Sequence, residues 1–150
     1  GKISVGAFFA MIVAAVAALF GVVVLDTNIA QPTLMIASII LGSFTFSAMG
    51  VIFGSIPTHN PGDVQMPSTL IRWILLFVSG VFVPLADMSA TARGFSYLSP
   101  LTYAQDLMNH AVLGMGELNI WLDLSILFIS GILFLLPSIK LHKRGRVLGY

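Results

Sequence analysis

Two long runs of this sequence contain no charged side chain, and they constrain the fold more than any other feature. The first covers residues 3–25 and ends just before Asp26, and the second covers residues 34–56. A helix needs about 20 apolar residues to cross the hydrocarbon core of a bilayer, and both runs are long enough. Both are continuously apolar rather than alternating, which argues against strands. The sequence therefore predicts membrane-spanning helices.

The composition points to the same class of protein. Hydrophobic residues make up 57% of the chain and charged residues 9%, whereas about a quarter of a soluble domain is charged. So few charges cannot cover a water-facing surface, and we expect an integral membrane protein. The absence of cysteine excludes disulfides and thiolate metal sites. A net charge of +1 gives no reason to expect a nucleic-acid partner.

Two further apolar runs complete the predicted bundle. They cover residues 70–86 and 120–139, and Asp123 lies one turn inside the second of them. Prolines and a glycine in residues 57–63 separate the second run from the third, as helix-ending residues do. We therefore expect an all-α, polytopic bundle of four transmembrane helices in a single domain, residues 1–150. Because the first residue is Gly1 rather than methionine, we also expect a piece of a longer chain.

The charged residues divide unequally between the two sides that four spans define. Of the seven basic residues, six fall on one side: Lys2, Arg72, Lys140, Lys143, Arg144 and Arg146. Only Arg93 falls on the other side, together with most of the acids. Lysine and arginine accumulate on the cytoplasmic side of membrane proteins. We therefore expect a multi-pass plasma-membrane protein with both ends of this segment, and the basic tail 140–150, in the cytoplasm. The tail is also expected to attract anionic membrane lipid.

Small residues recur on one face of each of the first two predicted spans. Those of the first span are Gly6, Ala10, Ala14 and Ala18, and those of the second are Ser43, Ser47, Gly50 and Gly54. In lipid, small residues promote helix association because they let two backbones approach closely. We therefore expect tight helix–helix seams at these faces. The pattern leaves open whether the partner helix belongs to the same chain.

The connection between the last two runs is too long for an ordinary loop and carries helix signals of its own. Ser99 and Pro100 suit the start of a helix, and Gly114 suits its end. A shorter helix is expected upstream. Two such helices are too short to cross a bilayer, so residues 87–118 are predicted to form a re-entrant or interfacial hairpin on the outer side. Irregular backbone at that depth is tolerated where protein or water covers it.

Three stretches of the sequence carry a resemblance to a known family. They are VSGVFVPL from Val78, LSPLTYAQDLMNHAVLG from Leu98 and the glycine-rich SAMGVIFGS from Ser47. Followed by a final apolar span and a basic tail, they resemble the permease subunits of type-2 ABC exporters, the ABC-2 type. In that family the fifth span ends in a similar element with serine, glycine and proline, and a re-entrant hairpin leads to the sixth span. The resemblance covers nearly the whole chain and implies the last four spans of a six-span permease.

The resemblance also implies a function. The chain would be the membrane-spanning permease subunit of an ATP-driven exporter and would form the translocation path across the cytoplasmic membrane. Two permease chains, identical or different, would pair, and each would bind a cytoplasmic ABC ATPase subunit that holds ATP and Mg²⁺. The hairpin would form the outer gate. The candidate gate residues are Pro84, Phe95, Tyr97, Pro100, Tyr103 and Asp106.

The residues themselves predict no catalytic, cofactor-binding or metal site in this chain. There is no Gly-Lys-Ser/Thr nucleotide loop, nucleophile elbow or zinc motif. The three histidines, His59, His110 and His142, have no ligand spacing. We interpret Asp106 as a solvated acid on the polar face of an outer helix, with a place in a substrate path as the alternative. Asp123 is interpreted as a helix-capping acid near the outer interface.

Other functions remain open on the sequence alone. One is a non-transporting membrane scaffold or assembly subunit. Another is an ion-coupled secondary transporter in which Asp123 couples protons. An intramembrane enzyme would need a reactive polar pair inside the spans, and the sequence offers none.

Overall fold

The computed structural model describes residues 2–24, 26, 28–56, 60, 62–80 and 82–147. Every regular element in this part of the chain is helical, which confirms the predicted all-α class. The elements are α1 (Lys2–Val24), α2 (Pro32–Gly54), α3 (Gly62–Val78), the 3₁₀ helix η1 (Leu85–Asp87), α4 (Ala90–Ser96), α5 (Pro100–Leu113) and α6 (Ile120–Val147). The connection between α3 and α6 contains the two short helices that the sequence predicts, α4 and α5, and the 3₁₀ helix η1 before them.

In the described part of the chain, three helices are long and apolar enough, by length and composition, to cross a membrane. They cover Ser4–Val24, Pro32–Gly54 and Ile120–Leu141, and they match the first, second and fourth predicted spans. Large apolar side chains along them are exposed, among them Val13 and Leu133. A helix that is apolar all round is typical of a membrane span, because lipid covers the outward face.

The third predicted span, residues 70–86, agrees with the structure only in part. Helix α3 begins eight residues earlier, at Gly62, and ends at Val78 after 17 residues. Gly80 then adopts a φ of 86°, a left-handed conformation that ends a helix and that glycine adopts at little cost. Pro84 leads into η1. The apolar run thus continues past the end of the helix, because apolar composition does not distinguish a helix from the turn that follows it.

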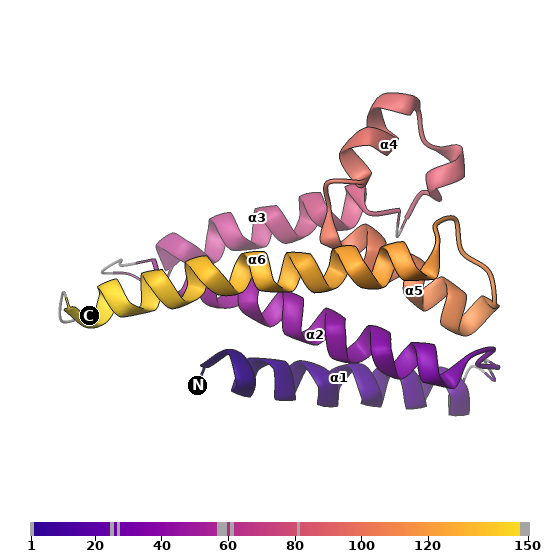
Figure 1. Cartoon of the computed structure of the whole chain (residues 1–150), viewed down its shortest axis with the longest axis horizontal. Coiled ribbons are helices and arrows are strands. Elements are labelled where there is room, and N and C mark those ends of the chain that lie inside the picture. The colour runs from indigo at the N-terminus through magenta and orange to yellow at the C-terminus, as the bar shows by residue number, and fades with distance from the viewer. Residues whose placement is uncertain are drawn as a thin grey trace.

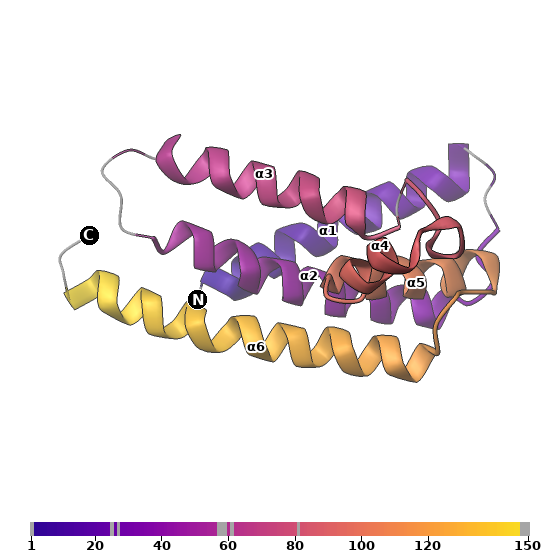
Figure 2. The same cartoon turned by 90° about the horizontal axis from the view of Figure 1, so that it is seen from above.

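The four longer helices run along the length of the molecule (Figure 1). Seen from above, α2 lies between α3 and α6 (Figure 2), and it contacts α1, α5 and α6 most extensively. Helix α1 begins and α6 ends in the left half of both views, while α4 and α5 lie in the right half. The short helices between α3 and α6 therefore gather at one end of the bundle, opposite the start of α1 and the end of α6.

The seam between α1 and α2 includes two of the small residues singled out in the sequence. A Cβ added to Gly6 would lie 2.5 Å from Ser47 Oγ, so α1 approaches α2 as closely as a glycine permits. Farther along, Gly50 and Gly54 have no neighbour within 4 Å of an added Cβ. Together with Ala10 they border a cavity of about 570 Å³ between α1, α2 and α3.

The remaining members of the two small-residue faces lie in less open surroundings. Ser43 is buried in α2, whereas Ala14 and Ala18 are half-buried in α1.

Two buried hydroxyl groups join α2 to α6. Thr45 Oγ1 on α2 donates to the Leu127 carbonyl oxygen over 3.0 Å, and Ser138 Oγ on α6 donates to the Ala48 carbonyl oxygen over 2.8 Å. Between them, a Cβ on Gly131 would lie 2.9 Å from Phe44 Cδ1. Serine and threonine hydroxyls at close helix crossings supply the polar contacts that hold helices together in lipid.

Candidate functional site

Residues 85–99 form a small folded unit at the end of the bundle. Ser89 caps α4, because its Oγ accepts a hydrogen bond from Ala92 N over 3.3 Å. The Arg93 guanidinium donates to the Leu85 carbonyl oxygen over 2.9 Å and to the Ala86 carbonyl oxygen over 3.1 Å. This side chain therefore fastens α4 back onto η1, and the segment between α3 and α5 is a defined structure rather than an open loop.

Hydroxyl groups hold the corner between α4 and α5. Thr102 Oγ1 donates to the Ser96 carbonyl oxygen over 2.6 Å, and the Tyr103 hydroxyl donates to the Tyr97 carbonyl oxygen over 2.7 Å. Burial, followed by the charge of Asp123, raises the pKa of Tyr103 above its usual value of 10.0. Its hydroxyl thus keeps the proton that this bond requires.

Helix α5 has the limits that its end residues predict. Pro100 is its first residue and Ser99 precedes it, although the Ser99 hydroxyl makes no capping bond. Gly114 ends it with a φ of 75° and donates to the His110 carbonyl oxygen over 3.1 Å. Near this end, Gln31 N donates to the Ala111 carbonyl oxygen over 2.8 Å. The connection between α1 and α2 is therefore bonded directly to α5.

The structure divides the six candidate gate residues into two sets. Pro84, Phe95 and Tyr97 are exposed, and Phe95 presents 59% of its surface. Pro100, Tyr103 and Asp106 are buried. One of the cavities, however, brings a residue of each set together.

One cavity of about 440 Å³ separates the end of α3 from α5 and the loop that follows it. Pro84 and Asp106 both line it, together with Gln105, Asn109 and Glu117. One exposed and one buried candidate gate residue therefore line the same cavity.

Asp106 is held by the loop between α5 and α6. It is only 2% exposed, and its two oxygens accept separate backbone bonds, Oδ1 from Glu117 N over 2.8 Å and Oδ2 from Leu118 N over 2.9 Å. The interpretation of Asp106 as a solvated acid is therefore wrong. The loop folds back over the helix and supplies two N–H donors that replace water, and a buried carboxylate needs such donors.

His110 lies one turn after Asp106 on the same helix. Its Nε2 is 3.4 Å from Asp106 Oδ2 and 2.8 Å from the Leu118 carbonyl oxygen. A carbonyl oxygen only accepts, so this nitrogen carries a hydrogen when it bonds to Leu118. A Cβ on Gly116 would lie 2.8 Å from Asp106 Oδ2, which shows how closely the loop covers both side chains.

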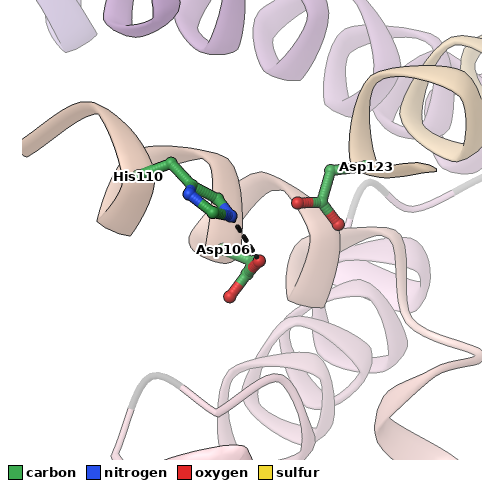
Figure 3. Close-up of side chains that lie close together, drawn as sticks. All are labelled: Asp106, His110 and Asp123. Carbon is green, nitrogen blue, oxygen red and sulfur yellow. Dashed lines mark ion pairs between the residues drawn. The ribbon is translucent and has the colours of Figure 1, made fainter. Parts of the chain in front are cut away.

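Asp123 completes this group from the first turn of α6 (Figure 3). It is 0% exposed, and neither of its carboxylate oxygens has a hydrogen-bond partner in the described structure. The interpretation of Asp123 as a capping acid is wrong, because its carboxylate accepts no hydrogen bond from the described residues. Asn119 Oδ1 instead accepts from Trp121 N at the start of α6. Asp123 is oriented inward, toward α5.

The sequence carries a signal for two members of this group but none for the third. Asp106 and His110 are four residues apart on a predicted helix, which places them on the same face. The position of Asp123 in the sequence does not indicate that it lies near Asp106 and His110. Only the fold of the 114–119 loop brings the start of α6 beside α5. Of the other histidines, His59 lies outside the described residues, as does the side chain of His142.

Comparison with known proteins relates this chain to membrane transport proteins. Residues 1–140 match the family model described as ABC-2 family transporter protein. The chain is 22% identical over 146 residues to the inner membrane transport permease YadH of Escherichia coli K12, which covers 97% of this chain and 55% of that protein. The proteins of the same name from Escherichia coli O157:H7 and Shigella flexneri give the same values. The chain thus spans about half the length of the curated relatives it matches. No solved structure gives a significant match.

Proposed function

Since this chain belongs to the ABC-2 family of transporter proteins, we propose that it is part of the membrane-spanning permease subunit of an ATP-driven exporter. The family match over residues 1–140 carries the proposal. Helices α1, α2 and α6 have the length and composition of membrane spans. In this role the chain contributes to the translocation path across the cytoplasmic membrane.

The energy source on this proposal is a separate protein. A cytoplasmic ABC ATPase subunit binds ATP and Mg²⁺, and a second permease chain, identical or related, completes the pathway. Two observations support this division. The relatives are named transport permeases, and the 150 residues contain no Gly-Lys-Ser/Thr loop that could cradle nucleotide phosphates.

The proposed orientation places the α1 start and the α6 end on the cytoplasmic side. These two ends lie in the same half of the bundle (Figures 1 and 2). Lys140 and Lys143 belong to the last turns of α6, whereas Asp87 and Glu117 belong to the opposite, hairpin end. This separation of charge follows the distribution of basic residues in cytoplasmic segments.

The hairpin at residues 87–118 is proposed to act as the outer gate. Its support is the cavity of about 440 Å³ that Pro84 and Asp106 border, and the exposure of Phe95 and Tyr97 on and beside α4. Polar side chains line that cavity next to apolar spans. Such irregular, polar regions at the ends of spans are where transporters open a path.

The proposal is tested by reconstituting the full-length protein with its candidate ATPase in proteoliposomes. The expected result is that the ATPase copurifies with the permease and that reconstitution changes its rate of ATP hydrolysis. An ATPase variant that lacks the phosphate-binding lysine serves as the control. A scaffold protein would leave the hydrolysis rate unchanged. Transport driven by a pH gradient without ATP would instead identify a secondary transporter.

A further inference from the structure

Three side chains that can bind a metal ion meet between α5 and α6. They are Asp106, His110 and Asp123, and one ligand atom of each lies within 4.8 Å of the other two. Figure 3 shows the Asp106 and His110 side chains directed toward each other from neighbouring turns of α5, with Asp123 approaching from α6. The group therefore bridges the hairpin and the last span.

Within the described residues, one member of this group has no hydrogen-bond partner. Asp106 receives two backbone N–H bonds and lies beside His110. Asp123 receives none, although it is fully buried and its carboxylate is directed into the group. A buried carboxylate without a partner is costly, and proteins normally pair it or use it to coordinate a metal. A bound cation would supply a partner for Asp123.

We propose that Asp106, His110 and Asp123 form a binding site for a divalent transition-metal cation of the Zn²⁺ class. Two carboxylates and one neutral imidazole give a charge of −2, which such an ion balances. Mixed nitrogen and oxygen ligands suit Zn²⁺, which binds through three protein groups and leaves one position open in many sites. This site is independent of the proposed transport function.

The geometry is compatible with an ion after a small adjustment. Ligand atoms at about 2.1 Å from Zn²⁺ lie about 3.4 Å apart in a tetrahedral set. The ligand atoms of the present group lie at most 4.8 Å apart, so they need to approach one another by no more than about 1.4 Å, a movement within reach of side-chain rotation. Binding of the ion to His110 Nε2 displaces the hydrogen that now bonds to Leu118. The ring then carries its hydrogen on Nδ1, so the imidazole stays neutral.

The surroundings supply the support and access that a metal site requires. The N–H groups of Glu117 and Leu118 fix the Asp106 carboxylate, as second-shell bonds do in metal sites. Asp106 also lines the cavity of about 440 Å³, which provides a path for the ion. A bound ion would fasten the hairpin to the beginning of α6.

The test measures metal binding by the purified full-length protein in lipid nanodiscs. After treatment with a chelator and its removal, the protein is titrated with Co²⁺, a coloured substitute for Zn²⁺, and bound Zn²⁺ is counted by elemental analysis. We expect one ion per chain and a rise in the thermal unfolding temperature on binding. Asp123→Asn and His110→Gln should each weaken binding more than tenfold.

A matched variant controls for the loss of any nearby charge. Asp87→Asn removes a carboxylate from the same end of the bundle, outside the group and its loop, and should bind the ion like the parent protein. The proposal is overturned if the parent binds neither Co²⁺ nor Zn²⁺, or if Asp123→Asn binds them with unchanged affinity. An Asp123→Asn variant that gains stability while the parent binds no metal would show that Asp123 holds a proton instead.

Discussion

Replacing Asp106 by asparagine tests whether the 114–119 loop is held by the Asp106 carboxylate. The carboxylate accepts one hydrogen bond on each oxygen, from Glu117 N over 2.8 Å and from Leu118 N over 2.9 Å. Asparagine offers only one acceptor oxygen, and its amide NH₂ would face the other N–H as a second donor. One charge-assisted bond is lost, and a backbone donor is left without a partner in a buried position.

The size of the effect follows from these two bonds. A hydrogen bond to a charged group contributes about 1.5–3 kcal/mol, so we expect Asp106→Asn to lower the free energy of unfolding by about 2–3 kcal/mol. Both proteins are unfolded at equilibrium in detergent micelles with a chelator present, so that no metal ion contributes. Hydrogen exchange at the Glu117 and Leu118 amides should accelerate in the variant.

Glu117→Gln is the matched control. The Glu117 carboxylate accepts one exposed bond of 3.2 Å from Ala86 N, and its change to glutamine should cost less than about 1 kcal/mol. If Asp106→Asn and Glu117→Gln reduce stability equally, or if the two loop amides exchange at unchanged rates, the assignment of the loop anchor to Asp106 is refuted.

The remaining predictions concern packing, backbone conformation and accessibility. Gly131→Ala should destabilise the protein by about 1–3 kcal/mol in the same unfolding assay, because its Cβ would lie 2.9 Å from a ring carbon of α2. Gly42→Ala, which meets nothing within 4 Å, should be neutral or slightly stabilising, and equal losses would contradict the seam. Gly114→Ala should cost about 1 kcal/mol at its positive φ, whereas Gly114→Asn should cost less, since asparagine tolerates this conformation better; the reverse order would refute the strain. A cysteine at Phe95 should react with a membrane-impermeant maleimide added outside, and a cysteine at Tyr103 should not, since Tyr103 is 6% exposed; labelling of both to the same extent would argue against the hairpin structure.

Local residue chemistry was sufficient to predict the ends of α5. Pro100 begins the helix and Gly114 ends it, because the missing N–H of proline and the left-handed conformation of glycine act at the position where they stand. The predicted apolar spans in α1, α2 and α6 follow equally directly from continuous hydrophobic runs. These features depend on neighbours in the sequence rather than on the rest of the fold.

The burial of Asp106 and Asp123 could not be predicted in the same way. Asp106 lies among polar residues on one face of α5, and that pattern normally indicates a surface. Its burial depends on a loop that returns over the helix and donates two backbone bonds. Asp123 enters the same group from a different helix, so no periodicity within either segment records their proximity. The end of α3 before Gly80 was missed because the apolar run continues through the turn.

The paired hydroxyl bonds between α2 and α6 restrict how this half of the molecule can move. Thr45 on α2 donates to α6, and Ser138 on α6 donates to α2. On α6 the two bonds involve Leu127 and Ser138, which are separated by about 16 Å of helical rise. The two helices are therefore joined at two well-separated levels. Sliding by a single turn would break both interhelical bonds together. It would leave the Thr45 hydroxyl without its partner on α6, whereas Ser138 Oγ would keep its bond to the Phe134 carbonyl oxygen of its own helix. Shape changes during a working cycle are therefore expected to carry α2 and α6 as one body and to fall on α3, whose side chains are largely free of the bundle.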